Sequence, residues 1–147
     1  MTHEASIIDP ATMVGSSPGA PDAGAPPTRA PELVCPAGSL PALKAAIDGG
    51  ADCVYLGLRD ATNARNFAGL NFDEAAIRSG IAYAHARGRK VLLALNTYPQ
   101  ASNPGPWHAA LDKAAAWGID AVILADPGLM RYATDHHPQM RLHLSVQ

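Results

Sequence analysis

Short apolar runs alternate with amphipathic segments along most of this 147-residue chain. The runs are rich in Val, Ile and Leu, as is typical of strands that are covered on both faces of a parallel sheet. They predict strands over residues 32–35, 52–58, 90–95, 121–125 and 141–146. Each of the first four runs is followed by apolar residues at helical spacing, so helices are expected to connect the strands.

Helix start and stop signals frame the connecting segments. The favoured N-cap residues Ser39, Asp73 and Asp126 precede three of the helical stripes, and Pro127 suits a first helical position. Glycine or proline then ends each stripe, at Gly49-Gly50, Gly88, Gly118 and Pro138. The third helix is expected over residues 107–117, and the fourth is expected to run to about His137.

Strands that alternate with helices indicate an α/β fold of parallel (βα) units with right-handed crossovers. Two architectures fit this order: an open doubly wound sheet, or the first half of a TIM-type (βα)8 barrel. The turn after the first strand, residues 35–38, has a single glycine where a dinucleotide fingerprint needs three. The barrel is therefore the favoured prediction.

The fifth predicted strand supports a barrel through its alternation. Leu142, Leu144 and Val146 share one parity, whereas Arg141 and His143 share the other. In a barrel the apolar set would face the helices and the polar set would face the interior.

Composition divides the chain into two parts. Residues 1–31 are rich in Pro, Ala, Gly and Ser and are expected to form a disordered tail that folding does not require, which leaves residues 32–147 as a partial barrel domain. The net charge of −2 and the absence of a basic block give no sign of a nucleic-acid partner. Neither a membrane span nor a signal peptide is evident, and the two cysteines, Cys35 and Cys53, suggest buried thiols in a reducing cytoplasm.

Polar residues gather where the predicted strands end, which is the edge that carries chemistry in barrels. The candidate ligand-binding residues are Arg59, Asp60, Asn63, Arg65, Asn66, Asn96, Asp126 and His143. The loop that holds Arg65 offers donors for an anionic or carbonyl-bearing ligand. In the structural alternative, Arg65 pairs with Asp60, the asparagines hold turns and Asp126 is only an N-cap. No residue is predicted to be catalytic or to bind a metal, because no Ser-His-Asp or HExxH pattern appears.

Two stretches resemble the collagenase-like peptidases, peptidase family U32. The first is the run ELVCPAGSLPALKAA with GGADCVYLG, residues 32–46 and 49–57, and the second is TNARNFAGLNF, residues 62–72. The second stretch is similar to members of the family that act in oxygen-independent ubiquinone biosynthesis. The resemblance covers residues 32–147.

The resemblance implies a barrel protein that carries a 4Fe-4S cluster on four cysteines. It also implies a heterodimer with a UbiV-like sister protein and hydroxylation of a quinone-precursor ring. In the family the cluster cysteines lie beyond the position of Gln147, so this chain is expected to be the front part of a longer protein and inactive alone. Two alternatives stay open: a collagenase-like peptidase acting on peptides or RNA-associated substrates, and an inactive gene fragment.

Overall fold

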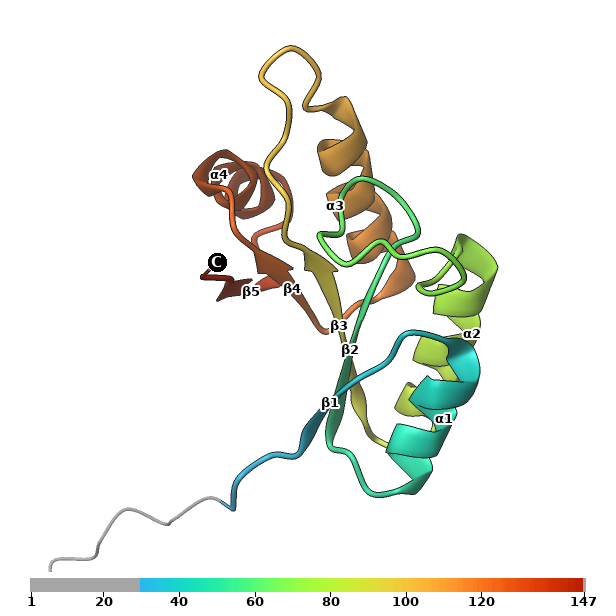
Figure 1. Cartoon of the computed structure of the whole chain (residues 1–147). Helices are drawn as coiled ribbons and strands as arrows, with labels where there is room; N and C mark the ends of the chain where they lie inside the picture. The colour runs from blue at the N-terminus through green and yellow to red at the C-terminus, as the bar shows by residue number, and fades with distance from the viewer. Residues whose placement is uncertain (1–29, 147) are drawn as a thin grey trace, which may run out of the picture. The chain divides into compact units, whose positions relative to one another are not determined.

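The structure, a computed structural model, describes residues 30–146, so nearly all of the expected tail lies outside the described residues. Strands and helices alternate from the first element to the last (Figure 1). The elements are β1 (Val34–Pro36), α1 (Leu40–Asp48), β2 (Cys53–Gly57), α2 (Glu74–His85), β3 (Lys90–Leu95), α3 (Gly105–Trp117), β4 (Ala121–Leu124), α4 (Pro127–His136) and β5 (Arg141–Leu144).

The five strands form one parallel sheet in the order β1-β2-β3-β4-β5. Sequential order with every strand parallel is the arrangement of a barrel wall, whereas a doubly wound sheet reverses its strand order at a switch point. The predicted parallel α/β fold is therefore confirmed.

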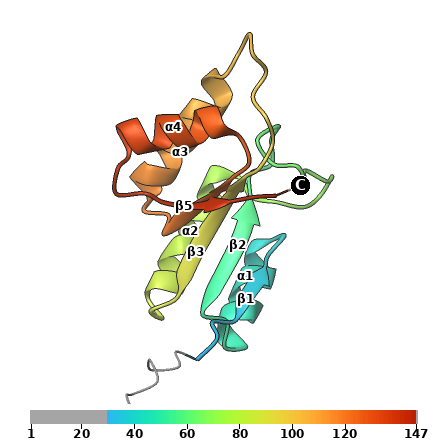
Figure 2. The ribbon, with the colours of Figure 1, turned by 90° about the vertical axis from the view of Figure 1, so that its left-hand side faces the viewer.

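The main core lies between the sheet and the helices. Alternate strand residues such as Val54, Leu93 and Val122 are fully buried there, against Leu43 of α1 and Leu111 of α3. Figure 1 shows α1 and α2 side by side along this face of the sheet. Figure 2, turned by 90° from Figure 1, shows the sheet from the side that these two helices do not cover, with α1 and α2 behind the strands.

The opposite side of the sheet, called the inner face below, has a second and smaller apolar cluster. Cys53, Leu92 and Ala121 are buried in it, and Tyr55 and Ile123 pack against them. The parity expected for the fifth strand is observed, because Leu142 packs on the main core while His143 lies opposite Ile123 of the inner face.

Two aspartates organise the amino ends of the strands. Asp52, just before β2, accepts a hydrogen bond from Leu33 N at 2.9 Å and is paired with Arg89. Asp120, just before β4, accepts one from Val91 N at 2.7 Å. Each carboxylate thus ties the start of its own strand to the strand before it, which fixes this end of the sheet.

The outer edge of β1 lacks one backbone donor. Ala37 N donates to Tyr55 O of β2 at 2.9 Å, so the preceding residue, Pro36, faces the outer edge. Proline has no N–H, and edge strands are where a sheet tolerates it. By contrast, at the other edge Leu144 of β5 is 68% exposed, and Val146, two residues beyond β5, is 88% exposed.

Element boundaries differ from the sequence predictions by a few residues. The third helix begins at Gly105 rather than Trp107, because Pro104 and Pro106 suit a first turn that needs no N–H donors. The fifth strand ends at Leu144, two residues early. Within the described residues, no helix combines the length and the apolar character that a membrane crossing requires.

Candidate functional site

A hollow of about 340 Å³ opens at the carboxyl ends of the strands. Its floor is the upper part of the inner face, where Tyr55, Ala94 and Ile123 come from three neighbouring strands. Ser145, directly after β5, and the turn after β1 complete it. This is the edge where barrel proteins bind their ligands.

The loop between β2 and α2 forms one side of the hollow. Its first turn is held by Asp60, whose carboxylate accepts hydrogen bonds from Thr62 N at 2.9 Å and from Thr62 Oγ1 at 2.6 Å. Its second turn is built on Asn63, which is only 6% exposed. Asn63 Nδ2 donates to Leu58 O at 3.1 Å, and its Oδ1 accepts from Arg65 N at 3.0 Å.

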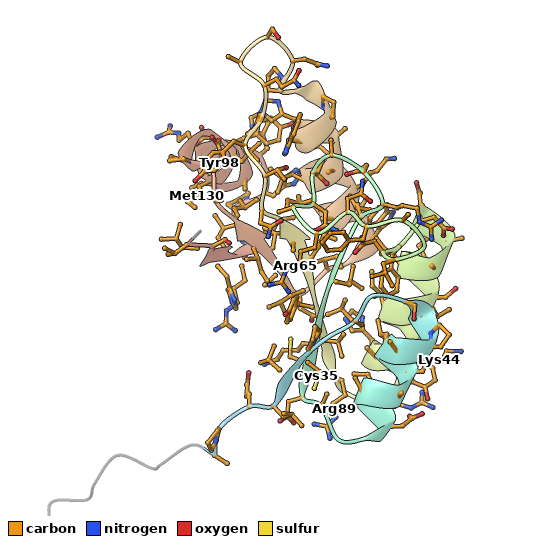
Figure 3. All side chains as sticks on the ribbon, in the orientation of Figure 1. Cys35, Lys44, Arg65, Arg89, Tyr98 and Met130 are labelled. Carbon is orange, nitrogen blue, oxygen red and sulfur yellow. The ribbon has the colours of Figure 1, made fainter. Side chains whose placement is uncertain are left out.

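Arg65 is held through its backbone at both polar groups. Asn63 Oδ1 accepts from its N–H, and Asn71 Nδ2 donates to its carbonyl oxygen at 2.8 Å. Arg65 is one of the residues that line the hollow, and its guanidinium forms neither a hydrogen bond nor an ion pair with any described residue. Figure 3 shows Arg65 on the side of the loop that faces away from α2.

The loop after β3 supports the loop that carries Arg65. Asn96 Oδ1 accepts from Ala64 N at 3.0 Å, and Thr97 Oγ1 donates to Ala61 O at 2.7 Å. The indole N–H of Trp107, at the start of α3, donates in turn to Thr97 Oγ1 at 2.9 Å. A helix, a strand end and two loops are therefore joined in one network.

Two backbone features let the loop fold down over the strand end. Asn71 adopts a positive φ of 73° and its N–H donates to Gly38 O at 2.7 Å, which joins the loop to the turn after β1. The Asn63 amide lies directly on Gly57, where an added Cβ would come within 2.3 Å of Asn63 Nδ2. Gly57 is thus required by the close approach of Asn63.

The structure gathers three of the eight sequence candidates, Asn63, Arg65 and Asn96, around the hollow. Arg59 and Asp60 instead line a second hollow, of about 430 Å³, between this loop and α3. Arg59 and Asp60 face a different hollow from Arg65 because the chain turns between Asp60 and Arg65, beyond the end of β2.

The other three candidates lie outside the residues that line the hollow. Asn66 is exposed on the loop, and Asp126 caps α4 by accepting from Leu129 N at 2.8 Å. His143 lies half-buried on the inner face of β5.

The alternative in which the loop residues have only structural roles agrees with the contacts of the asparagines but not with those of Arg65. Asn63 and Asn71 do hold turns, as that alternative expects. Asp60 is engaged by Thr62, two residues away, and no ion pair joins it to Arg65. The guanidinium is thereby left available to a ligand.

The two cysteines do not fit an iron–sulfur cluster. Cys35 lies on the helix-covered face of β1 and Cys53 on the inner face of β2, so their thiols point to opposite sides of the sheet. Burial raises the pKa of Cys53 to about 11, which keeps its thiol protonated at neutral pH. Residues 30–146 contain no group of three or more His, Cys, Asp or Glu side chains able to hold a metal ion.

Several residues of the hollow were not among the sequence candidates. Tyr55 could have been found from alternation, because it shares the inner face with Cys53. Phe67 and Leu70 are largely exposed apolar side chains at the rim, and they carry no signal in the sequence that separates them from ordinary loop residues.

A parallel (βα) sheet in sequential order, with a ligand-sized hollow at its carboxyl ends, defines the class as a TIM-barrel-like protein. The family model described as "Peptidase family U32" matches residues 38–147, and the chain belongs to this family. The resemblance seen in the sequence is confirmed at the level of the family.

Curated relatives match the same part of the chain. The tRNA hydroxylation protein P of Helicobacter pylori is 40% identical over 116 residues, which are 79% of this chain and 27% of that protein. Its namesake in Escherichia coli is 37% identical over 118 residues, 80% of this chain and 25% of that protein. An uncharacterized protease of Methanocaldococcus jannaschii is 40% identical over 116 residues, 79% and 28% of the two chains. This chain thus spans about a quarter of the length of these relatives.

Solved structures show the same fold. The U32 peptidase Mk0906 superimposes with a TM-score of 0.60 at 16% identity, covering 90% of this chain and 53% of that one. Tryptophan synthase from M. tuberculosis gives 0.53 at 14% identity, covering 78% and 55% of the two chains.

Proposed function

We propose that this chain forms the substrate-binding half-barrel of a U32-family hydroxylation protein that acts on a flat ring. The observation that carries the proposal is the composition of the hollow. Tyr55, Ile123 and Leu70 offer apolar contact to a ring, while Arg65 and Asn96 lie around it as polar groups. Its volume of about 340 Å³ is at the small end of ligand pockets and suits one ring with its substituents.

The first candidate for the ring is a base of tRNA. Relatives that are 37–40% identical are named tRNA hydroxylation proteins. The net charge of −2 gave no sign of a nucleic-acid partner, and this candidate goes beyond that expectation. A single base turned out of its stack needs a ring-sized pocket with a few hydrogen-bonding groups, not a broad basic surface on this segment.

The second candidate is the ring of a ubiquinone precursor. It is favoured by residues 62–72, the same loop that builds the hollow, which resemble the loop of the ubiquinone biosynthesis protein UbiU. In this case the partner is a UbiV-like sister protein. For both candidates an iron–sulfur cluster would need cysteines outside residues 30–146, because Cys35 and Cys53 point to opposite sides of the sheet.

The peptidase alternative has less support at this hollow. Serine and cysteine nucleophiles work with a hydrogen-bonded base, most often histidine. Among the described residues, the histidines that hydrogen-bond another side chain, His85 and His137, do so with aspartates outside the hollow. No serine or cysteine among the described residues forms a hydrogen bond with a histidine ring.

Chimeras test the proposal in an intact protein. The aligned 118-residue segment of the E. coli tRNA hydroxylation protein P is replaced by its counterpart from this chain, in a strain that lacks the native gene. Restored hydroxylated nucleoside in digested tRNA, measured by mass spectrometry, supports the first candidate. A parallel chimera with a UbiU protein, scored by ubiquinone content under anaerobic growth, tests the second.

Matched variants tie the result to the hollow. Arg65→Ala should abolish the product in the chimera that works, whereas Arg131→Ala should leave it unchanged, since Arg131 lies on α4 with Asp135 as its partner. Two soluble, folded chimeras that both yield no product would refute the proposed function.

A further inference from the structure

We propose that Arg65 recognises an oxyanion, a carboxylate or a phosphate, carried by the ring-bearing ligand. This inference rests on the proposed function and names the chemistry of its substrate. The guanidinium is the specificity-determining group in this role, and the apolar floor receives the ring. The proposal follows from the charges around the hollow, the way the loop holds the arginine and the side chains beside it.

The charge distribution around the hollow calls for a negative ligand. Among the described residues that line it, Arg65 is the single charged one, and the others are apolar, glycine, amide or hydroxyl residues. Four other arginines of the described chain, Arg78, Arg87, Arg89 and Arg131, have carboxylate partners, for example Arg78 with Glu74 at 3.1 Å and Arg131 with Asp135 at 2.7 Å. Arg59 and Arg141 have none within the described range, but neither lines this hollow. A guanidinium in a hollow without a counter-charge matches the fork geometry of a carboxylate or phosphate.

The loop holds Arg65 in place before any ligand arrives. Asn63 and Asn71 engage its N–H and its carbonyl, so the backbone cannot rotate without breaking a hydrogen bond at each side. Asn63 in turn is seated on Gly57, and Asn71 is fixed to Gly38. Such support lowers the entropy cost of binding, because only side-chain torsions remain to be ordered.

The neighbours of Arg65 define the rest of the ligand. Phe67 and Leu70 lie on the same rim, and Tyr55 lies on the floor. A ligand that contacts both the apolar side chains and the Arg65 guanidinium has a flat apolar body joined to an oxyanion. A free inorganic anion would contact only the guanidinium, and a neutral ring only the apolar side chains.

Binding of simple probes to the full chain tests the inference. The ¹⁵N-labelled protein is titrated at pH 7 with benzoate, phenyl phosphate, benzyl alcohol and inorganic phosphate, and amide shifts are followed at the hollow. Benzoate or phenyl phosphate should bind at least about tenfold more tightly than benzyl alcohol, since a charge-assisted hydrogen bond adds this much. The stronger of the two anionic probes identifies a carboxylate or a phosphate source.

Three variants decide whether Arg65 is responsible. Arg65→Gln should remove the preference for the anionic probes, Arg65→Lys should keep part of it, and Arg131→Gln should preserve it fully. The fold should survive in all three, because the loop is held through the Arg65 backbone and not through its guanidinium. A preference that persists in Arg65→Gln, equal binding of anionic and neutral rings, or no response of the hollow to either anion would overturn the inference.

Failure of this inference and failure of the proposed function are distinguishable. The probes report on anion recognition in the isolated chain, while the chimeras report on product in the intact protein. Product from a chimera together with no anion preference in the chain would retain the ring hydroxylation proposal and discard the role of Arg65.

Discussion

Replacing Gly57 by alanine tests the central contact of the loop. The new Cβ would lie 2.3 Å from Asn63 Nδ2, 2.5 Å from its Cγ and 2.9 Å from its Oδ1. The Asn63 amide must therefore leave its position. Its two hydrogen bonds, to Leu58 O and from Arg65 N, would then be broken.

The magnitude follows from those bonds. Each hydrogen bond contributes roughly 0.5–1.5 kcal/mol, and a buried polar group left without a partner costs about 1–3 kcal/mol. Gly57→Ala should thus lower the free energy of unfolding by about 2–4 kcal/mol. For a domain of this size that corresponds to a fall in Tm of roughly 8–16 °C.

Urea and thermal unfolding, followed by circular dichroism, measure the effect. Gly105→Ala is the matched control, because its Cβ would meet only Asn103 Oδ1, at an ordinary 3.4 Å. A double-mutant cycle with Asn63→Ala gives the decisive result. If the clash acts through the Asn63 amide, Gly57→Ala should cost little once that amide is gone. Fully additive losses, or an unchanged Tm in Gly57→Ala, would refute the reasoning.

Three further predictions concern other parts of the fold. His137 hydrogen-bonds Asp112 at 2.7 Å and lowers the pKa of that carboxyl below its ordinary 3.8. The ionised carboxylate therefore stabilises the folded protein at pH values above 3.8, and this contribution is lost as the pH falls through the lowered pKa. His137→Ala should therefore flatten the acid limb of stability against pH, by a few tenths of a kcal/mol because the pair is exposed. Cys53, with its pKa raised to about 11, should resist iodoacetamide at pH 8 in the folded protein and react after denaturation. Because Leu144 is 68% exposed on the edge strand β5, the chain should associate at high concentration in sedimentation experiments. Leu144→Lys should reduce this association while leaving the unfolding midpoint nearly unchanged.

The helix starts could be predicted from the sequence because a cap is a local interaction. Ser39, Asp73 and Asp126 each accept a hydrogen bond from the N–H three residues later, as their identity suggested. The parallel strand order was also accessible, since it follows from alternating strand and helix patterns. The parity of Leu142 and His143 identified the two faces of the sheet for the same reason.

The arrangement of the hollow depends on contacts that the sequence pattern does not contain. The loop folds back so that Leu58 pairs with Phe72, and its end reaches Gly38 through Asn71. That path separates Arg59 from Arg65, although both follow the same strand. The sequence also could not show whether Asp60 pairs with Arg65. In the structure the Asp60 carboxylate instead accepts two hydrogen bonds from Thr62, which leaves Arg65 without this partner.

Pro36 makes the two edges of the sheet unequal as partners for a further strand. The edge at β1 is three residues long and lacks a backbone donor at its last residue, Pro36, which faces outward. The edge at β5 is free of proline and bordered by exposed Leu144 and Val146. A newly arriving strand therefore finds a better template beside β5 than beside β1. Backbone pairing with a further strand, including one from a second copy of this chain, is therefore favoured beside β5 and disfavoured beside β1.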